Sequence, residues 1–181
     1  MNNNNNKIKN FFKTTLKVIE QTIDRITIVA FAILFIQIPH FVVQYKQRLG
    51  GHVDELASII QQYKEAATLS GKTIKEYINL FLDSGIPEFI NAGKIMNLNL
   101  ERLDYLNKAL NDLMSSSSFT QFFIFLKTMD HKICKATLAN FTPGIAFNFE
   151  ALIYAFVGSI IGFIIFSTIK KIIYLIFRIK T

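Results

Sequence analysis

The chain has 181 residues, 51% of them hydrophobic, and its 20 Lys and Arg against 13 Asp and Glu give a net charge of +7. A single cysteine, Cys134, excludes an intrachain disulfide, and no Cys or His spacing matches a zinc site. The positive charge lies at the two ends of the chain and not on one segment, which argues against binding to nucleic acid.

The charges form three blocks along the chain. Residues 1–25 hold five basic and two acidic side chains, residues 46–150 hold 11 of each, and residues 170–181 hold four basic ones. The resulting net charges of +3, 0 and +4 follow the positive-inside pattern of a protein that crosses a membrane twice. We therefore expect both termini in the cytoplasm and the neutral middle segment on the opposite, extracytoplasmic side.

The first block precedes any span. Residues 2–6 are an Asn run, which cannot bury apolar surface and is expected to be disordered. Residues 8–24 place apolar side chains on one helical face and lysines elsewhere, a pattern typical of a basic amphipathic helix on the cytoplasmic leaflet. A basic lead-in without defined structure is the alternative.

Two apolar runs without charge, residues 26–45 and 151–169, contain 20 and 19 residues. At a rise of about 1.5 Å per residue, each covers the roughly 30 Å hydrocarbon core of a bilayer, which predicts two transmembrane helices. Two buried helices of a soluble domain are one alternative. A cleaved signal peptide is another for the first run, but no small-residue cleavage site follows, which favours an uncleaved anchor.

The segment between the spans, residues 46–150, has helical periodicity and no strand pattern. The sequence thus predicts an all-α membrane protein whose two transmembrane helices flank a helical extracytoplasmic hairpin or bundle, with a basic cytoplasmic tail at residues 170–181. The helices expected in the middle segment cover residues 53–67, 73–82, 88–114 and 119–141, and the turns cover residues 70–71, 83–85, 115–118 and 142–144.

The longest of these helices carries leucines at the 3-4-3 spacing of a coiled-coil seam, namely Leu103, Leu106, Leu110 and Leu113. The apolar stripe of residues 53–67 is the natural partner of this seam.

A polar stripe runs along one face of the first span. It consists of Gln37, His40, Gln44 and Gln47, which step by three, four and three residues. Polar groups inside a membrane need partners, so the stripe is expected to serve helix assembly or a proton or solute path, unless it simply lies in the headgroup region. Pro39 in the same stretch removes a backbone donor and predicts a kink.

The densest polar cluster follows directly and comprises Arg48, Gly50, Gly51, His52, Asp54 and Glu55. The two glycines are expected to break or bend the helix just outside the bilayer. His52, Asp54 and Glu55 could ligate a metal or act as an acid–base group, but ligands from one segment do not close a site. The other interpretation is the first turn of a helix over residues 53–67, where acidic side chains suit the helix dipole.

In the second span, Gly158 and Gly162 form a GxxxG motif, which Ala151 and Ala155 extend. Small residues allow helix backbones to approach closely, so this face is expected to pack on the first span or on a second copy of the chain.

Catalytic motifs are absent from the sequence: there is no GxSxG, no HExxH and no glycine-rich phosphate loop. We therefore expect no enzymatic activity, no cofactor and no bound metal.

Residues 37–55 resemble the signature block of a bacterial inner-membrane family catalogued only as a domain of unknown function (family 2937). Pro143, Gly144, Gly158 and Gly162 are similar to that family's re-entry turn and second span, and the resemblance covers residues 26–171. It implies a two-span bacterial inner-membrane protein with an extracytoplasmic helical domain, and it supplies no activity.

The function expected from these features is that of a non-catalytic interaction or scaffold component of the cell envelope. Its partners would be the lipid bilayer and a second copy or another membrane protein, held through the second span or the coiled-coil seam. The alternatives are an accessory subunit of a transporter or channel that uses the polar stripe, and a metal site or enzyme at the membrane boundary.

Overall fold

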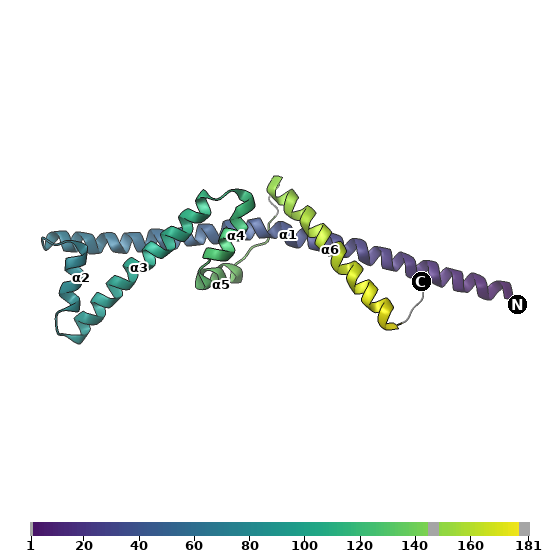
Figure 1. Cartoon of the computed structure of the whole chain (residues 1–181), viewed down its shortest axis with the longest axis horizontal. Helices are drawn as coiled ribbons and strands as arrows, with labels where there is room; N and C mark the ends of the chain where they lie inside the picture. The colour runs from purple at the N-terminus through teal and green to yellow at the C-terminus, as the bar shows by residue number, and fades with distance from the viewer. Residues whose placement is uncertain (1, 145–148, 178–181) are drawn as a thin grey trace. The chain divides into compact units, whose positions relative to one another are not determined.

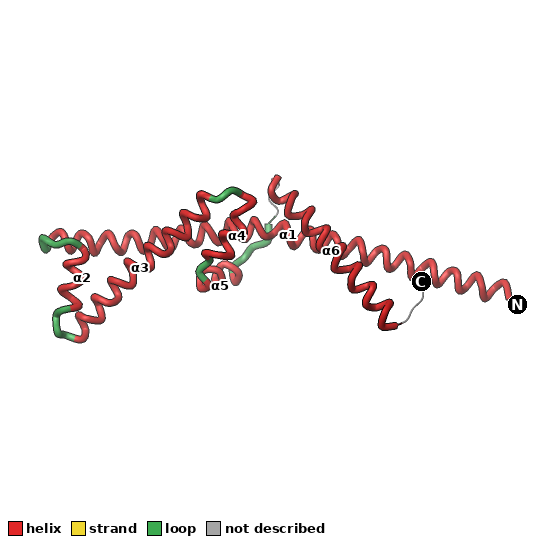
Figure 2. The backbone as a smooth tube through the Cα atoms, viewed as in Figure 1, coloured by secondary structure: helices red, strands yellow, loops and turns green. Residues whose placement is uncertain are grey.

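The computed structural model describes residues 2–144 and 149–177, and this part of the chain forms six helices and no strand (Figure 2). The prediction of an all-α protein is confirmed. The helices are α1 (Asn2–Leu69), α2 (Ile74–Leu82), α3 (Pro87–Ser115), α4 (Ser118–Thr128), α5 (His131–Ala139) and α6 (Phe149–Phe177) (Figure 1).

The chain divides into two compact units. The first unit combines residues 1–40 with residues 143–181, and the second consists of residues 41–142. Two helical stretches are long and apolar enough to cross a membrane, Thr14–Leu69 and Ala151–Ile173. With 68 residues, α1 is far longer than the roughly 20 residues that one crossing requires.

Helix α1 is continuous where the sequence predicted a break. Of the break or bend predicted at Gly50 and Gly51, the break is wrong, because both residues lie inside α1. Each interior glycine costs only about 0.5–1 kcal/mol relative to alanine. Tyr45, Leu49 and Val53 are buried on both sides of the glycine pair, and their burial outweighs that cost.

The N-terminal part of α1 differs from expectation at the Asn run only. The helix begins at Asn2, so residues 2–6 are helical and not a disordered run, whereas the helix expected over residues 8–24 is present and continues into the first span. Once a helix is nucleated, each further residue adds one hydrogen bond, which favours extension of a stable apolar helix into its flank. Pro39 is accommodated inside α1 and is buried.

The core of the second unit joins α1 to three other helices. Its buried members are Val42, Tyr45, Leu49 and Val53 of α1, Leu106, Ala109 and Leu113 of α3, Phe125 of α4, and Ile133 of α5. Of the predicted stripe over residues 53–67, Val53 is buried in this cluster and Leu56 packs against it. The other α1 members lie before the stripe, so the contact with the leucine seam is displaced toward the first span. The α1 face begins at Val42, so the last residues of the expected first span pack against protein.

Local capping explains where α2 begins. The backbone N–H of Glu76 donates to Thr73 Oγ1 (3.3 Å), and the N–H of Thr73 donates to Glu76 Oε2 (2.8 Å), which forms a capping box. Gly71 before α2 and Gly85 after it adopt φ angles of 65° and 68°, a conformation that glycine adopts without strain. The turns expected at residues 70–71 and 83–85 are confirmed.

The single helix expected over residues 119–141 is in fact two helices, α4 and α5. Asp130 separates them, because its carboxylate accepts hydrogen bonds from the N–H groups of Lys132 (2.9 Å) and Ile133 (3.0 Å) and so caps α5. Aspartate is a favoured N-cap residue, so Asp130 itself was a signal in the sequence for a helix start. The apolar spacing on both sides of it favoured one continuous helix instead.

Candidate functional site

The polar stripe of the first span begins in the first unit, where it holds the segment that leads into α6. The backbone N–H of Gly144 donates a hydrogen bond to Gln37 Oε1 (3.1 Å). The His40 ring lies against the same glycine, since a Cβ atom at position 144 would lie 2.8 Å from His40 Nε2. Gln37 and His40 therefore fix the point at which the chain re-enters the first unit.

The stripe continues in the second unit with the same kind of contact. Gln44 Nε2 donates to the carbonyl oxygen of Thr142 (2.9 Å) and to Thr142 Oγ1 (3.3 Å). Gln47, the last member of the stripe, is exposed. The amides of Gln37 and Gln44 thus bind the backbone of this chain, which is what helix assembly requires of polar groups in an apolar setting.

The Arg48–Glu55 cluster is not gathered into a site. Gly51, His52, Asp54 and Glu55 are exposed on the continuous helix α1, whereas Arg48 and Gly50 are half-buried. A Cβ atom at either glycine would meet nothing within 4 Å, so neither glycine serves a close approach. Within residues 2–144 and 149–177, no three His, Cys, Asp or Glu side chains lie together as a metal site would require.

A polar junction that sequence reasoning missed is centred on Asp130. Its backbone N–H donates to the hydroxyl of the buried Tyr45 (2.8 Å), and its carboxylate pairs with Arg102 of α3 (3.3 Å). Burial raises the pKa of Asp130, but the N–H groups that cap α5 and the Arg102 charge outweigh burial and leave that pKa below its usual value. Because Tyr45 and Asp130 are 85 positions apart, no local signal could reveal their contact.

Aromatic rings surround this junction. The Phe125 ring of α4 packs edge-on against Tyr45 (centroids 5.0 Å apart) and against Phe41 (5.8 Å). Phe41 also meets Phe141, at 5.5 Å. Edge-to-face pairs of this kind contribute about 0.5–1.5 kcal/mol each beyond their buried area, so they fix the start of the second unit.

The GxxxG motif of α6 contacts α1. A Cβ atom at Gly158 would lie 2.6 Å from Phe35 Cβ and 2.7 Å from the Phe31 carbonyl oxygen, and one at Gly162 would lie 2.9 Å from Phe31 Cβ. Only glycine leaves room for this approach. We call the contact of Gly158 and Gly162 with Phe31 and Phe35 the glycine seam.

The two helices of the seam are antiparallel. Along α6, Gly158 meets Phe35, Gly162 meets Phe31, and Lys170 forms an ion pair with Glu20. The residue numbers rise on α6 as they fall on α1, so the described ends of the chain lie at the same end of this helix pair.

These features define the class: an all-α protein in which two helices able to cross a membrane pair in antiparallel fashion, with a four-helix segment and the end of α1 forming a second unit. The chain belongs to the family described as protein of unknown function (DUF2937), whose model matches residues 19–179. The resemblance inferred from residues 37–55 is thereby confirmed at the level of the family. No curated protein and no solved structure matches the chain.

The Asp130 junction gives a stability prediction. Replacing Asp130 by alanine removes the cap of α5 and should lower the free energy of unfolding by about 1 kcal/mol. Tyr45→Phe should be destabilising by about 1–3 kcal/mol, because the Asp130 N–H then lacks its acceptor. Thermal or urea unfolding of the full chain in detergent, followed by circular dichroism, measures both effects.

Asp54→Ala is the matched control, because Asp54 is exposed on α1. The pKa of Asp130 is lowered in the folded state, so its carboxylate stabilises the wild type at pH values above the unfolded-state pKa of about 4. The difference in stability between the wild type and Asp130→Ala should shrink as the pH falls below about 4 and through the lower folded-state pKa. Equal stability of Asp130→Ala and Asp54→Ala at pH 7 would contradict the junction.

Proposed function

We propose that this protein is a non-catalytic interaction or scaffold component of the bacterial cell envelope, anchored in the inner membrane by two spans with both termini in the cytoplasm. One observation carries the proposal: the polar groups best placed for chemistry in the first span bind this chain's own backbone. The Gln37 amide accepts from Gly144, and the Gln44 amide donates to Thr142. The two amides therefore have a structural role.

The glycine seam supports the role of an anchor. Lipid supplies no hydrophobic driving force between two apolar helices, so their association depends on close packing. The two glycines of the seam allow that close packing. The net charges of +3 before the first span and +4 after the second support the cytoplasmic placement of both ends. The Glu20–Lys170 ion pair joins those two basic flanks.

The two alternative functions have less support. A transport path along the stripe would need the Gln37 and Gln44 amides that already hold the backbone. A metal site or enzyme at His52, Asp54 and Glu55 would need further ligands, and these exposed side chains come from one helix.

The surfaces first expected to bind a partner are used inside the chain. The glycine seam contacts α1, and Leu106 and Leu113 of the leucine repeat are buried in the core of the second unit. We therefore propose that another membrane protein binds the remaining face of the second span, where Phe156 and Phe163 are 67% and 53% exposed.

The orientation can be measured by cysteine labelling. Cys134 is half-buried, and burial raises the pKa of its thiol, so it is first replaced by serine. In that background, Leu69→Cys at a 90% exposed position should react with a membrane-impermeant maleimide in intact spheroplasts. Thr14→Cys, which is also exposed, should react only after the membrane is permeabilised. Reaction of Thr14→Cys in intact spheroplasts would exclude a cytoplasmic N-terminus.

The scaffold role can be tested by placing a photo-crosslinking amino acid at Phe156 in native membranes. We expect a discrete protein adduct larger than the monomer. It should persist in the His52→Ala, Asp54→Ala, Glu55→Ala triple variant and be lost in Gly158→Ile, which cannot fit against Phe35.

Gly51→Ile is the matched control for that substitution, because its Cβ atom meets open space. The absence of any protein adduct at Phe156 and at Phe163, or loss of the adduct in the triple alanine variant at normal expression, would count against the proposal.

A further inference from the structure

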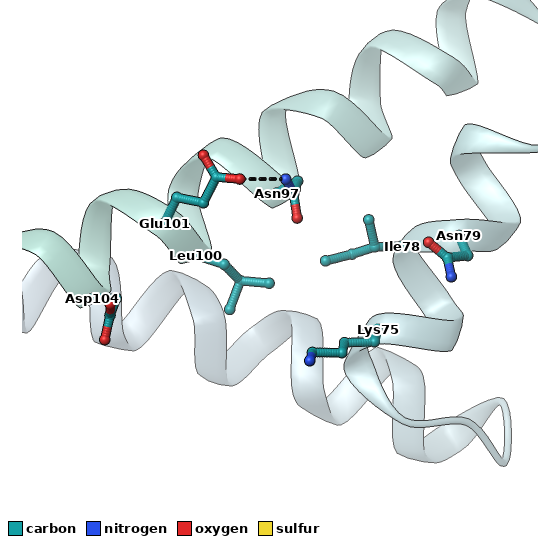
Figure 3. A pocket seen from close by; sticks show the side chains of 7 residues that line it. All are labelled: Lys75, Ile78, Asn79, Asn97, Leu100, Glu101 and Asp104. Atoms are coloured by element: carbon teal, nitrogen blue, oxygen red, sulfur yellow. Dashed lines mark hydrogen bonds between the residues drawn. The ribbon is translucent and has the colours of Figure 1, made fainter.

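A cleft of about 680 Å³ lies between α2 and α3 in the second unit (Figure 3). This volume falls within the roughly 300–1,000 Å³ of small-molecule sites. The two helices are in contact near the turn that joins them, because a Cβ atom at Gly93 of α3 would lie 3.0 Å from both Phe81 Cβ and Leu82 Cδ2. Away from this close approach the helices diverge (Figure 1), and the cleft opens between them.

The floor of the cleft is apolar. Ile78 of α2 is buried and Leu100 of α3 is half-buried, and their side chains extend toward one another across the cleft (Figure 3). An apolar group of a ligand placed on this floor would leave water, which favours binding by about 25 cal/mol per Å² of surface removed.

Opposite charges line the two sides above that floor. Lys75 comes from α2, whereas Glu101 and Asp104 come from α3 at positions that share one helical face. In the part of the chain that the structure describes, neither Lys75 nor Asp104 has an ion-pair or hydrogen-bond partner. Glu101 accepts one hydrogen bond, from Asn97 Nδ2 (2.8 Å). The charged groups therefore remain available to a ligand that carries both signs.

This arrangement discriminates between classes of ligand. A phosphate or another anion would be repelled by the two carboxylates, and an amine that carries no carboxylate would leave the Lys75 ammonium without a partner. A zwitterion can satisfy both sides at once. Asn79, exposed at the rim, adds an amide that can donate and accept.

We propose that this cleft binds a small zwitterion with an apolar side chain, of the class of free aliphatic amino acids and their dipeptides. The ligand's carboxylate pairs with Lys75, its ammonium pairs with Asp104, and its apolar side chain lies on Ile78 and Leu100. This site lies wholly within the second unit and is independent of the scaffold role proposed above.

The test is a saturation-transfer NMR titration of the full chain in lipid nanodiscs with three probes: leucine, N-acetylleucine and leucinamide. Leucine should give a saturable signal. N-acetylleucine lacks the ammonium and leucinamide lacks the carboxylate, so each should bind about tenfold more weakly, the loss expected when one charge-assisted hydrogen bond is removed.

Two variants assign each charge to its side of the cleft. In Lys75→Met, leucine should bind no more tightly than leucinamide but still more tightly than N-acetylleucine. In Asp104→Asn, leucine should bind no more tightly than N-acetylleucine but still more tightly than leucinamide. Lys132→Met, at an exposed position on α5, is the matched control and should bind all three probes as the wild type does.

Lys75 and Asp104 are exposed, so these substitutions leave the core intact, and circular dichroism verifies the fold. Equal binding of the three probes, or no saturable leucine signal up to about 20 mM, well beyond the millimolar range of weak ligands, would overturn the proposal.

Discussion

The close approach of α6 to α1 at Gly158 and Gly162 is the contact on which the rest of the structure depends. It brings a glycine backbone against Phe31 and Phe35, at a distance where any Cβ atom would collide. Because the helices run antiparallel, this contact also holds the two points where the chain leaves and re-enters the first unit. There the His40 ring lies against Gly144, and the Gln37 amide accepts the Gly144 N–H. The helix pair thus fixes both ends of the inserted segment.

Within the second unit, Tyr45 has the corresponding role. It is fully buried, its ring meets Phe125, and its hydroxyl accepts the N–H of Asp130. Asp130 in turn caps α5 and pairs with Arg102, so one residue of α1 is linked to α3, α4 and α5. A buried polar group of this kind is stable only when its partners are in place, which makes the junction specific for this arrangement of helices.

The sequence predicted the features that local chemistry decides. Gly71 and Gly85 lie in the predicted turns and adopt positive φ angles. The helix predicted over residues 73–82 is present, and Thr73 and Glu76 cap its start. The apolar runs predicted two helices able to span a membrane, and they are present.

The sequence failed where distant contacts decide. Gly50 and Gly51 read as a helix break, yet Tyr45, Leu49 and Val53 bury the same face on either side and keep the helix intact. The apolar spacing of residues 119–141 predicted one continuous helix, so the helix start at Asp130 was missed. The contact between Asp130 and Tyr45 could not be inferred because the two residues are far apart in the sequence. Among the candidate residues, Gln37, His40 and Gln44 make contacts within the chain. His52, Asp54 and Glu55 are exposed on α1 and do not form a site.

The glycine seam can be measured directly by disulfide formation in native membranes. In a Cys134→Ser chain, Phe31→Cys combined with Gly162→Cys places two Cβ atoms about 2.9 Å apart, near the 3.5–4.5 Å of a disulfide, so slight separation of the helices suffices. Oxidation should give a bond within one chain, seen as a monomer of altered mobility. The pair Leu34→Cys and Gly162→Cys, with Leu34 62% exposed, should not form this bond. Equal crosslinking of both pairs, or crosslinks between chains only, would contradict the close pairing of α1 and α6.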